Sequence, residues 1–165
     1  MHLIIDGNNL IHQSSELFPA QDMERGREAL LLALRLYRQK KTHRVTVVFD
    51  GGSEPEPSRA TRQGVPVVWA GARHSADQVI VEMVGRHGAG MTVVTDDREL
   101  GELCRAKGAE VVPARVFAGL LLDTAQGRAP IEEDEEGWDF TTRKKGPSRR
   151  EPRARRRQRR RLERL

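Results

Sequence analysis

The sequence lacks the features by which secreted and membrane proteins are recognised. Its single cysteine, Cys104, excludes an intramolecular disulfide and is compatible with a reducing compartment. We expect this thiol to pack in the core, because it lies near Leu100 and Leu103 on the apolar side of a predicted helix. No basic segment precedes an apolar signal core, and the longest apolar stretch, around residues 30–36, is too short to span a bilayer. We therefore expect a cytoplasmic protein with no membrane partner.

Common catalytic motifs are missing as well. The five histidines show no HxxxH or similar spacing, which argues against a zinc site. No Ser-His-Asp or Cys-His arrangement is apparent, and there is no glycine-rich phosphate-binding loop of the P-loop form. The sequence thus offers no evident nucleophilic side chain, and any catalytic chemistry has to come from other residues.

Charge is distributed unevenly along the chain. The whole chain has a net charge of +5, but residues 143–165 contain thirteen Lys or Arg and two Glu, a local charge of +11. Residues 1–142 therefore sum to −6. This asymmetry predicts a polyanionic partner held by the basic extension, with acidic lipid headgroups or the chain's own acids at 132–136 as alternatives to RNA. The arginines expected to bind nucleic acid there are Arg155, Arg156, Arg157, Arg159, Arg160 and Arg161.

Strand and helix patterns alternate through residue 123. The strand-like runs of Val, Ile and Leu are continuous rather than alternating, which is typical of parallel strands covered on both faces. They are expected at residues 2–6, 44–49, 65–69, 91–95 and 110–112. Helices are expected at residues 8–16, at 22–41, from Ser75 with Gln78 as its capping-box partner, from Asp96 or Asp97, and at 113–123. The order predicts an α/β fold with a central parallel sheet of about five strands.

Three segments carry no regular pattern. Residues 51–64 are interpreted as a mobile Gly/Pro-rich loop, from which Arg59 and Arg62 could either reach a phosphate backbone or lie in solvent. Residues 126–142 are predicted to be a disordered acidic linker, and residues 143–165 a basic tail that is disordered or becomes helical when bound. The folded domain is therefore expected to span residues 1–125.

Four of the apolar strands run into an acidic residue or an acid-containing turn. The acids concerned are Asp6, Asp50, Asp77, Asp96 and Asp97. Ligands of open α/β sheets bind beyond the carboxyl ends of the strands, and carboxylates gathered there repel one another unless a cation lies between them. A hard divalent cation with oxygen ligands is the natural occupant. The pattern predicts a site for metal-dependent phosphodiester chemistry.

Each of these acids also has a purely structural interpretation. Asp6 could be the N-cap of the following helix, while the amide of Asn9, one short step into that helix, could orient Asp6 or a bound water. Asp50 could be a metal ligand, an outer partner of the ligands, or simply the first residue of a turn. Asp77 lies in the first turn of its helix, where the macrodipole stabilises an acid without a metal.

Two assignments stay open for the pair of aspartates after the fourth strand. Asp96 and Glu99 have the spacing of a capping-box pair, which would leave Asp97 free for the site. In the reverse assignment Asp97 is the cap and Asp96 is the metal ligand. Glu99 is expected to be peripheral in either case.

The acidic motifs together resemble those of a known family. They occur in the order seen in NYN domains of the PIN-like nuclease superfamily, with the nearest similarity to the YacP-like branch, and the resemblance covers about residues 1 to 123. The motifs are Ile5-Asp6-Gly7-Asn8-Asn9, Phe49-Asp50-Gly51, Ala76-Asp77-Gln78-Val79-Ile80 and Thr95-Asp96-Asp97-Arg98-Glu99-Leu100.

The resemblance implies a three-layer α/β/α PIN-like fold and a Mg²⁺- or Mn²⁺-dependent endoribonuclease. By motif position, the catalytic metal-binding acids match Asp6, Asp77 and Asp97, and supporting positions match Asn9, Asp50 and Glu99. A common pattern in this branch has Ser or Gly where Asp96 stands, so the extra negative charge departs from that pattern, and either of the adjacent aspartates, Asp96 or Asp97, could bind the metal. RNA, including messenger or ribosome-associated RNA, is the implied partner, and a non-catalytic RNA- or ribosome-binding module of the same fold is the alternative.

Two other kinds of domain also place acids at strand ends. A haloacid-dehalogenase-like phosphatase needs a second Asp two positions after the first, where Asn8 stands. A phosphoryl-acceptor receiver domain needs a Lys after its fifth strand, where Pro113-Ala114-Arg115 stands. These mismatches disfavour both classes.

Overall fold

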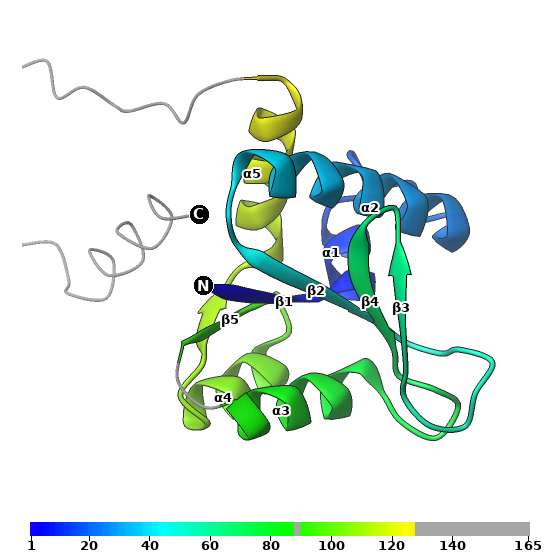
Figure 1. Cartoon of the computed structure of the whole chain (residues 1–165), viewed down its shortest axis with the longest axis vertical. Coiled ribbons are helices and arrows are strands. Elements are labelled where there is room, and N and C mark those ends of the chain that lie inside the picture. Colours follow the sequence, from blue (N-terminus) through cyan, green and yellow to red (C-terminus); the bar gives the residue numbers. More distant parts are fainter. Residues whose placement is uncertain (88–89, 128–165) are drawn as a thin grey trace, which may run out of the picture.

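A single six-stranded sheet organises the chain, and the computed structural model describes residues 1–87 and 90–127 of it (Figure 1). The strands are β1 (His2–Asp6), β2 (Arg44–Phe49), β3 (Ser58–Arg62), β4 (Val65–Trp69), β5 (Met91–Val94) and β6 (Glu110–Val112). Their order across the sheet is β3-β4-β2-β1-β5-β6. All neighbouring pairs are parallel except β3 and β4. The mainly parallel sheet predicted from the sequence is confirmed.

The register brings the carboxyl ends of the central strands to one level. Ile5 of β1 is aligned with Val47 of β2 on one side and with Val94 of β5 on the other. These strands are buried along nearly their whole length, which explains why their sequences are continuously apolar. The residues that follow β2, β1 and β5 therefore meet at the same edge of the sheet.

Helices cover both faces of the sheet and complete three layers. The first face carries α1 (Gly7–Gln13), α2 (Met23–Lys40) and α5 (Ala114–Ala125), and the second carries α3 (Ala76–His87) and α4 (Arg98–Ala106) (Figure 1). Alternate residues of β1 enter the two cores: Ile5 packs against the first group of helices and Ile4 against the second. Cys104 is completely buried in the second core, as predicted.

Local capping residues fix where the helices begin. Asp22 caps α2 by accepting a hydrogen bond from the backbone N–H of Arg25 (3.2 Å). The predicted capping box at the start of α3 is present: the N–H of Gln78 donates to the Ser75 hydroxyl (3.2 Å), and the N–H of Ser75 donates to the Gln78 side chain (3.1 Å). The predicted helix at residues 8–16 is shorter than expected, because α1 ends at Gln13.

The interpretation of residues 51–64 as a loop without regular structure was wrong in part. β3 pairs with β4 in antiparallel fashion across a turn whose two residues, Gln63 and Gly64, both have positive φ (52° and 78°). Four of the five residues of β3 are exposed, so the strand is held by backbone pairing rather than by apolar side chains. The sheet consequently has six strands, one of them antiparallel.

The predicted linker and tail lie almost wholly outside the described residues. This applies to residues 128–165, which include the arginine run from Arg155 to Arg161. Within residues 1–87 and 90–127, none of the helices has both the length and the apolar character needed to cross a bilayer.

Candidate functional site

Acidic residues from four neighbouring strands meet at the carboxyl edge of the sheet. Asp6 ends β1, Asp50 follows β2, Asp77 lies in the first turn of α3 after β4, and Asp97 follows β5. The negative charges of Asp97, Asp50 and Glu99 each help to raise the pKa of Asp77, after the effect of burial. The acids therefore influence one another electrostatically at this edge, while their roles as metal ligands stay predictions.

Asp6 is the most perturbed acid of this cluster. Its side chain is only 5 % exposed, and both of its oxygens are hydrogen-bonded: Oδ1 accepts from the N–H of Asn9 (3.2 Å) and Oδ2 from the hydroxyl of Thr95 (3.1 Å). Burial raises the pKa of Asp6 to about 6, the charges of Asp77 and Asp50 add to the rise, and the two hydrogen bonds oppose it. Asp6 is thus both the N-cap of α1 and a member of the acidic cluster.

Thr95 links two of the acidic turns, a role that the sequence did not reveal. Its buried hydroxyl donates to Asp6 Oδ2 and accepts a hydrogen bond from the backbone N–H of Asp97 (3.0 Å). The only sequence signal was a hydroxyl residue directly after a strand that is mostly apolar. The contact holds the turn after β5 against the end of β1.

Asp97 is the N-cap of α4, so the first assignment of the aspartate pair was wrong. Its Oδ1 accepts a hydrogen bond from the N–H of Leu100 (2.9 Å), and its backbone is extended. Because the Thr95 hydroxyl holds the N–H of Asp97, it is Asp97 rather than Asp96 that occupies the capping position. Glu99 lies in the first turn of α4 and is exposed.

Asp96 and Asn9 tie three elements together beside the cluster. Asn9 Oδ1 accepts a hydrogen bond from the backbone N–H of Asp96 (2.8 Å), so its side chain positions this turn rather than Asp6. Asp96 Oδ2 accepts from the backbone N–H of Arg115 at the start of α5 (3.3 Å). The Asp96 carboxylate is thereby engaged by α5, while Asp97 is engaged by α4.

Asp50 fixes the start of α3 next to Asp77. Its Oδ1 accepts a hydrogen bond from the backbone N–H of Ala76 (2.7 Å), and its Oδ2 accepts one from Asn8 Nδ2 (3.0 Å). The side-chain Oδ1 of Asn8 is buried and has no hydrogen-bond partner within residues 1–87 and 90–127. A buried oxygen of this kind needs a donor or a cation, which makes Asn8 a candidate site residue that the sequence prediction did not include.

The oxygen atoms available at this edge are of the kind that binds a hard divalent cation, but among the described residues the acidic side chains are not arranged to hold one. Within the two described stretches of the chain, no three His, Cys, Asp or Glu side chains stand together so that they could hold a metal ion. The reason is local, since Asp6 and Asp97 turn toward the helix N-termini that they cap. All the available donors are nevertheless oxygens, and they include the unpartnered oxygen of Asn8, which suits Mg²⁺ or Mn²⁺ better than a softer metal.

The two arginines predicted to contact a phosphate backbone lie on β3. Arg59 is aligned with Val68, and Arg62 is aligned with Val65, with its guanidinium 6.0 Å from the centre of the Trp69 ring. Another cation, Arg27 of α2, lies over both Phe49 and Trp69, with its guanidinium 5.4 and 5.1 Å from the ring centres. Because Phe49 directly precedes Asp50, this missed arginine lies near the acidic edge.

Comparison with known proteins decides the family. A family model described as the YacP-like NYN domain matches residues 3–165. The chain belongs to the YacP-like NYN family. The match extends beyond the motifs at residues 1 to 123 and takes in the C-terminal segment, and membership indicates a nuclease-like, RNA-related protein. A search of curated proteins gave no match.

Two solved structures share the fold of this NYN domain. The crystal structure of Rae1 (YacP) from Bacillus subtilis has a TM-score of 0.61 and 21 % sequence identity, covering 77 % of this chain and 76 % of that one. The crystal structure of a tryptophan-to-leucine mutant of the same Bacillus subtilis protein has a TM-score of 0.62 and 22 % identity, covering 76 % of this chain and 77 % of that one. Together with the family match, these likenesses confirm the three-layer PIN-like fold.

Proposed function

We propose that this NYN domain is an endoribonuclease that depends on Mg²⁺ or Mn²⁺. The main support is the buried carboxylate of Asp6, which lies at the carboxyl edge of the sheet within the electrostatic reach of Asp77 and Asp50. A folded chain tolerates such mutual repulsion poorly unless a cation offsets it, and acids with perturbed pKa values in one place are a mark of functional sites. The NYN family supplies RNA as the class of substrate.

Three carboxylates would hold the metal, namely those of Asp6, Asp77 and Asp97. Asp97 uses only Oδ1 as a cap, and Asp77 is exposed at the start of α3. Each oxygen of Asp6 accepts one hydrogen bond and keeps a second lone pair for a cation. The unpartnered Oδ1 of Asn8 is a fourth oxygen, and Asp96 is a less favoured ligand because α5 engages it. A bound metal ion supplies an activated water and neutralises charge on the phosphoryl group.

The surrounding residues position these ligands. Thr95 holds Asp6 and the turn of Asp97 together, Asn9 holds the backbone of Asp96, and Asp50 holds the first residue of α3. Asp77 is therefore presented from a helix whose start is fixed. The absence of a nucleophilic side chain in the sequence motifs agrees with attack by water.

The alternative is an RNA- or ribosome-binding module of the same fold without cleavage activity. It is favoured by one observation: within residues 1–87 and 90–127, no three potential ligands stand ready to hold a metal. In that case Asp6 and Asp97 would serve only as helix caps.

Incubation with RNA separates the two proposals. Purified full-length protein is mixed with structured and single-stranded RNAs in Mg²⁺, Mn²⁺ or EDTA, alongside the Asp6→Asn and Asp77→Asn variants. We expect internal cleavage that EDTA abolishes and that both variants lose while they still bind RNA. Asp22→Asn is the matched control, since Asp22 caps α2 outside the site. Binding without cleavage by the unaltered protein under every condition would favour the module.

A further inference from the structure

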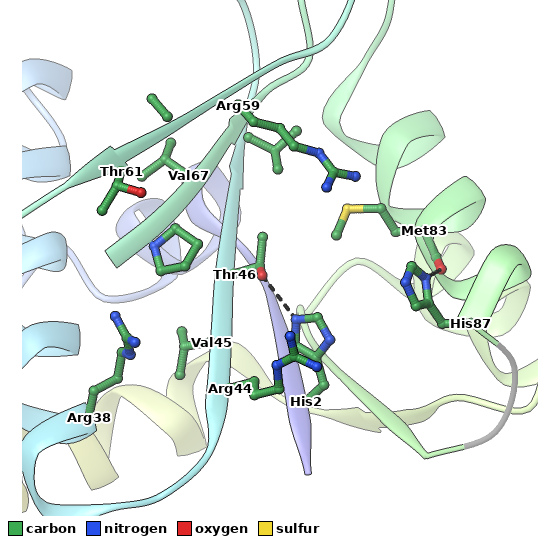
Figure 2. A pocket seen from close by; sticks show the side chains of 13 residues that line it. His2, Arg38, Arg44, Val45, Thr46, Arg59, Thr61, Val67, Met83 and His87 are labelled. Atoms are coloured by element: carbon green, nitrogen blue, oxygen red, sulfur yellow. Dashed lines mark hydrogen bonds between the residues drawn. The ribbon is translucent and has the colours of Figure 1, made fainter. Parts of the chain in front are cut away.

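A hollow lies mainly on the face of the sheet that α3 covers, and it runs from His2 and Arg44, at the amino ends of β1 and β2, to Arg59 on β3 (Figure 2). Its volume is about 680 Å³, and residues of β1, β2, β3, β4 and α3 line it. His2 and Arg44 begin β1 and β2, whereas the acidic residues follow the opposite ends of these strands. We call this hollow the basic groove and define it by His2, Arg44, Thr46, Arg59 and His87.

The basic groove is lined by apolar side chains together with positive and neutral polar ones, and its described lining includes no Asp or Glu. Figure 2 shows Arg59 extending over the hollow toward α3, with His2 and Arg44 at its other end. Within the described residues, the side chains of Arg44 and Arg59 form no ion pair or hydrogen bond. Arg38 also borders the groove, but its guanidinium donates to the carbonyl of Gly64. Arg44 and Arg59 are therefore available to an anion.

The surroundings of His2 agree with a positive electrostatic potential in the groove. The pKa of His2 is lowered by burial and then by the positive charges of Arg44 and His87. His2 Nε2 lies 2.9 Å from the hydroxyl of Thr46, and His87 Nδ1 donates to the carbonyl of Met83 (2.9 Å). These contacts hold both rings in place, and the Nε2 atom of His87 is left to face a ligand.

The groove stands out against the rest of the folded chain. Residues 1–127 contain sixteen Asp or Glu and fifteen Lys or Arg, a net charge of −1. Of the two unpaired cations, Arg44 stands at the amino end of β2, whereas Arg59 is aligned with Val68, level with the carboxyl end of β1. This arrangement suits a polyanion whose phosphates follow the cations along the strands while one of them reaches the acidic edge.

A neighbouring hollow extends the basic groove toward the start of α3. Its lining shares Arg59, Val68 and Met83 with the basic groove and continues to Glu56 and His74, which precede the start of α3. Apart from Arg59, the cations of this neighbouring hollow are already paired, because His74 contacts Glu56 (2.9 Å) and Arg86 pairs with Glu82. The neighbouring hollow therefore continues the basic groove toward the start of α3 with little net charge of its own.

We infer that the basic groove binds the phosphate backbone of an RNA strand that runs along β3 from the acidic edge. This inference rests on the proposed function. Arg44 and Arg59 can form charge-assisted hydrogen bonds to phosphate oxygens, and the Thr61 hydroxyl lies in the same lining. The described lining includes no Phe, Tyr or Trp ring on which a base could stack. The groove therefore contributes affinity without sequence preference.

The salt dependence of RNA binding tests this inference. Full-length protein and the double variant Arg44→Ala/Arg59→Ala are titrated with single-stranded RNA in EDTA over a range of salt concentrations. Each phosphate contact on a single strand contributes about 0.7 to the slope of log K against log salt, so losing two should reduce the slope by roughly 1.4. The control Arg35→Ala/Arg105→Ala removes the same charge from exposed positions outside the groove and should change the slope far less.

The outcomes separate this inference from the proposed function. If the unaltered protein binds RNA and the groove variant keeps the same slope, the groove is not the path, while cleavage at the acidic edge is untouched. If the unaltered protein binds no RNA, both the proposed function and the inference about the groove are wrong. A photoreactive Thr61→p-benzoylphenylalanine variant identifies the occupant directly: a crosslink to RNA supports the inference, and a crosslink to the chain's own acidic segment at residues 132–136 overturns it.

Discussion

Replacing Asp6 by asparagine should make the metal-free protein more stable at alkaline pH, although it removes a proposed ligand. A buried acid with a pKa of about 6, against 3.8 in an unfolded chain, is ionised at pH 8 at a cost to the folded state. Asn is nearly the same size and carries no charge. Its Oδ1 can still accept the hydrogen bond from Asn9, so the cap of α1 is retained.

The expected gain in stability can be calculated from the raised pKa of Asp6. A difference of this size in pKa corresponds to about 3 kcal/mol, at 1.36 kcal/mol per pH unit. The variant gives up the hydrogen bond that Thr95 donates to Asp6, because the amide nitrogen of Asn must donate instead, and this loss costs about 1 kcal/mol. The net gain at pH 8 is therefore roughly 2 kcal/mol.

The difference in stability between the variant and the unaltered protein depends on pH, and this dependence tests the reasoning. A raised pKa means that the folded chain holds the proton more tightly, so the penalty is absent below the unfolded value of 3.8, grows as the pH rises and is complete above about 6. Urea unfolding in EDTA should show the variant to be more stable than the unaltered protein at pH 8 and no more stable near pH 4. A variant that is less stable by the same amount at both pH values would refute the reasoning.

Three further predictions concern the supports of the site and the basic segment. Thr95→Val should cost about 1–3 kcal/mol in urea unfolding, because the backbone N–H of Asp97 and an oxygen of Asp6 both lose a buried partner. Gly7→Ala should lower the thermal midpoint, since a Cβ there would lie 2.2 Å from Phe49 Cε1, whereas Gly119→Ala, with nothing within 4 Å, should leave it unchanged or raise it. Deleting residues 143–165 should reduce the slope of log K for RNA binding against log salt without abolishing metal binding. An unchanged slope would mean that the thirteen basic residues of this segment do not contact RNA.

The central strands could be predicted because buried strands have continuously apolar sequences, and the acids could be placed at one edge because they follow these strands. Continuous runs such as Leu3 to Ile5 are apolar since both faces of the sheet are covered. β3 escaped prediction because Arg59, Ala60, Thr61 and Arg62 are exposed and its pairing uses backbone atoms, which no side-chain pattern records. The turn at Gly64 was the only available sign of a hairpin.

The division of roles within the site could not be predicted to the same depth. Whether Asp96 or Asp97 caps α4 depends on a hydrogen bond from the Asp97 N–H to Thr95, a residue from the end of the preceding strand. The positions of Asn8 and Arg27 likewise depend on contacts between distant segments: Asn8 reaches Asp50 after β2, and Arg27 of α2 lies over the Trp69 ring of β4. The order of the motifs was enough to predict that the acids lie at one edge of the sheet. Which oxygen contacts which partner depends on tertiary contacts.

The proposed endoribonuclease activity depends most directly on one divalent cation that the acids at the carboxyl edge share. Binding of Mn²⁺ measured by electron paramagnetic resonance tests this in the full-length protein, in Asp77→Asn and in the control Asp22→Asn. We predict one site whose affinity falls at least about tenfold in Asp77→Asn, as expected even for a partner outside the direct ligands, and is unchanged in Asp22→Asn. Equal binding by all three proteins, or no binding by the unaltered protein, would contradict the account.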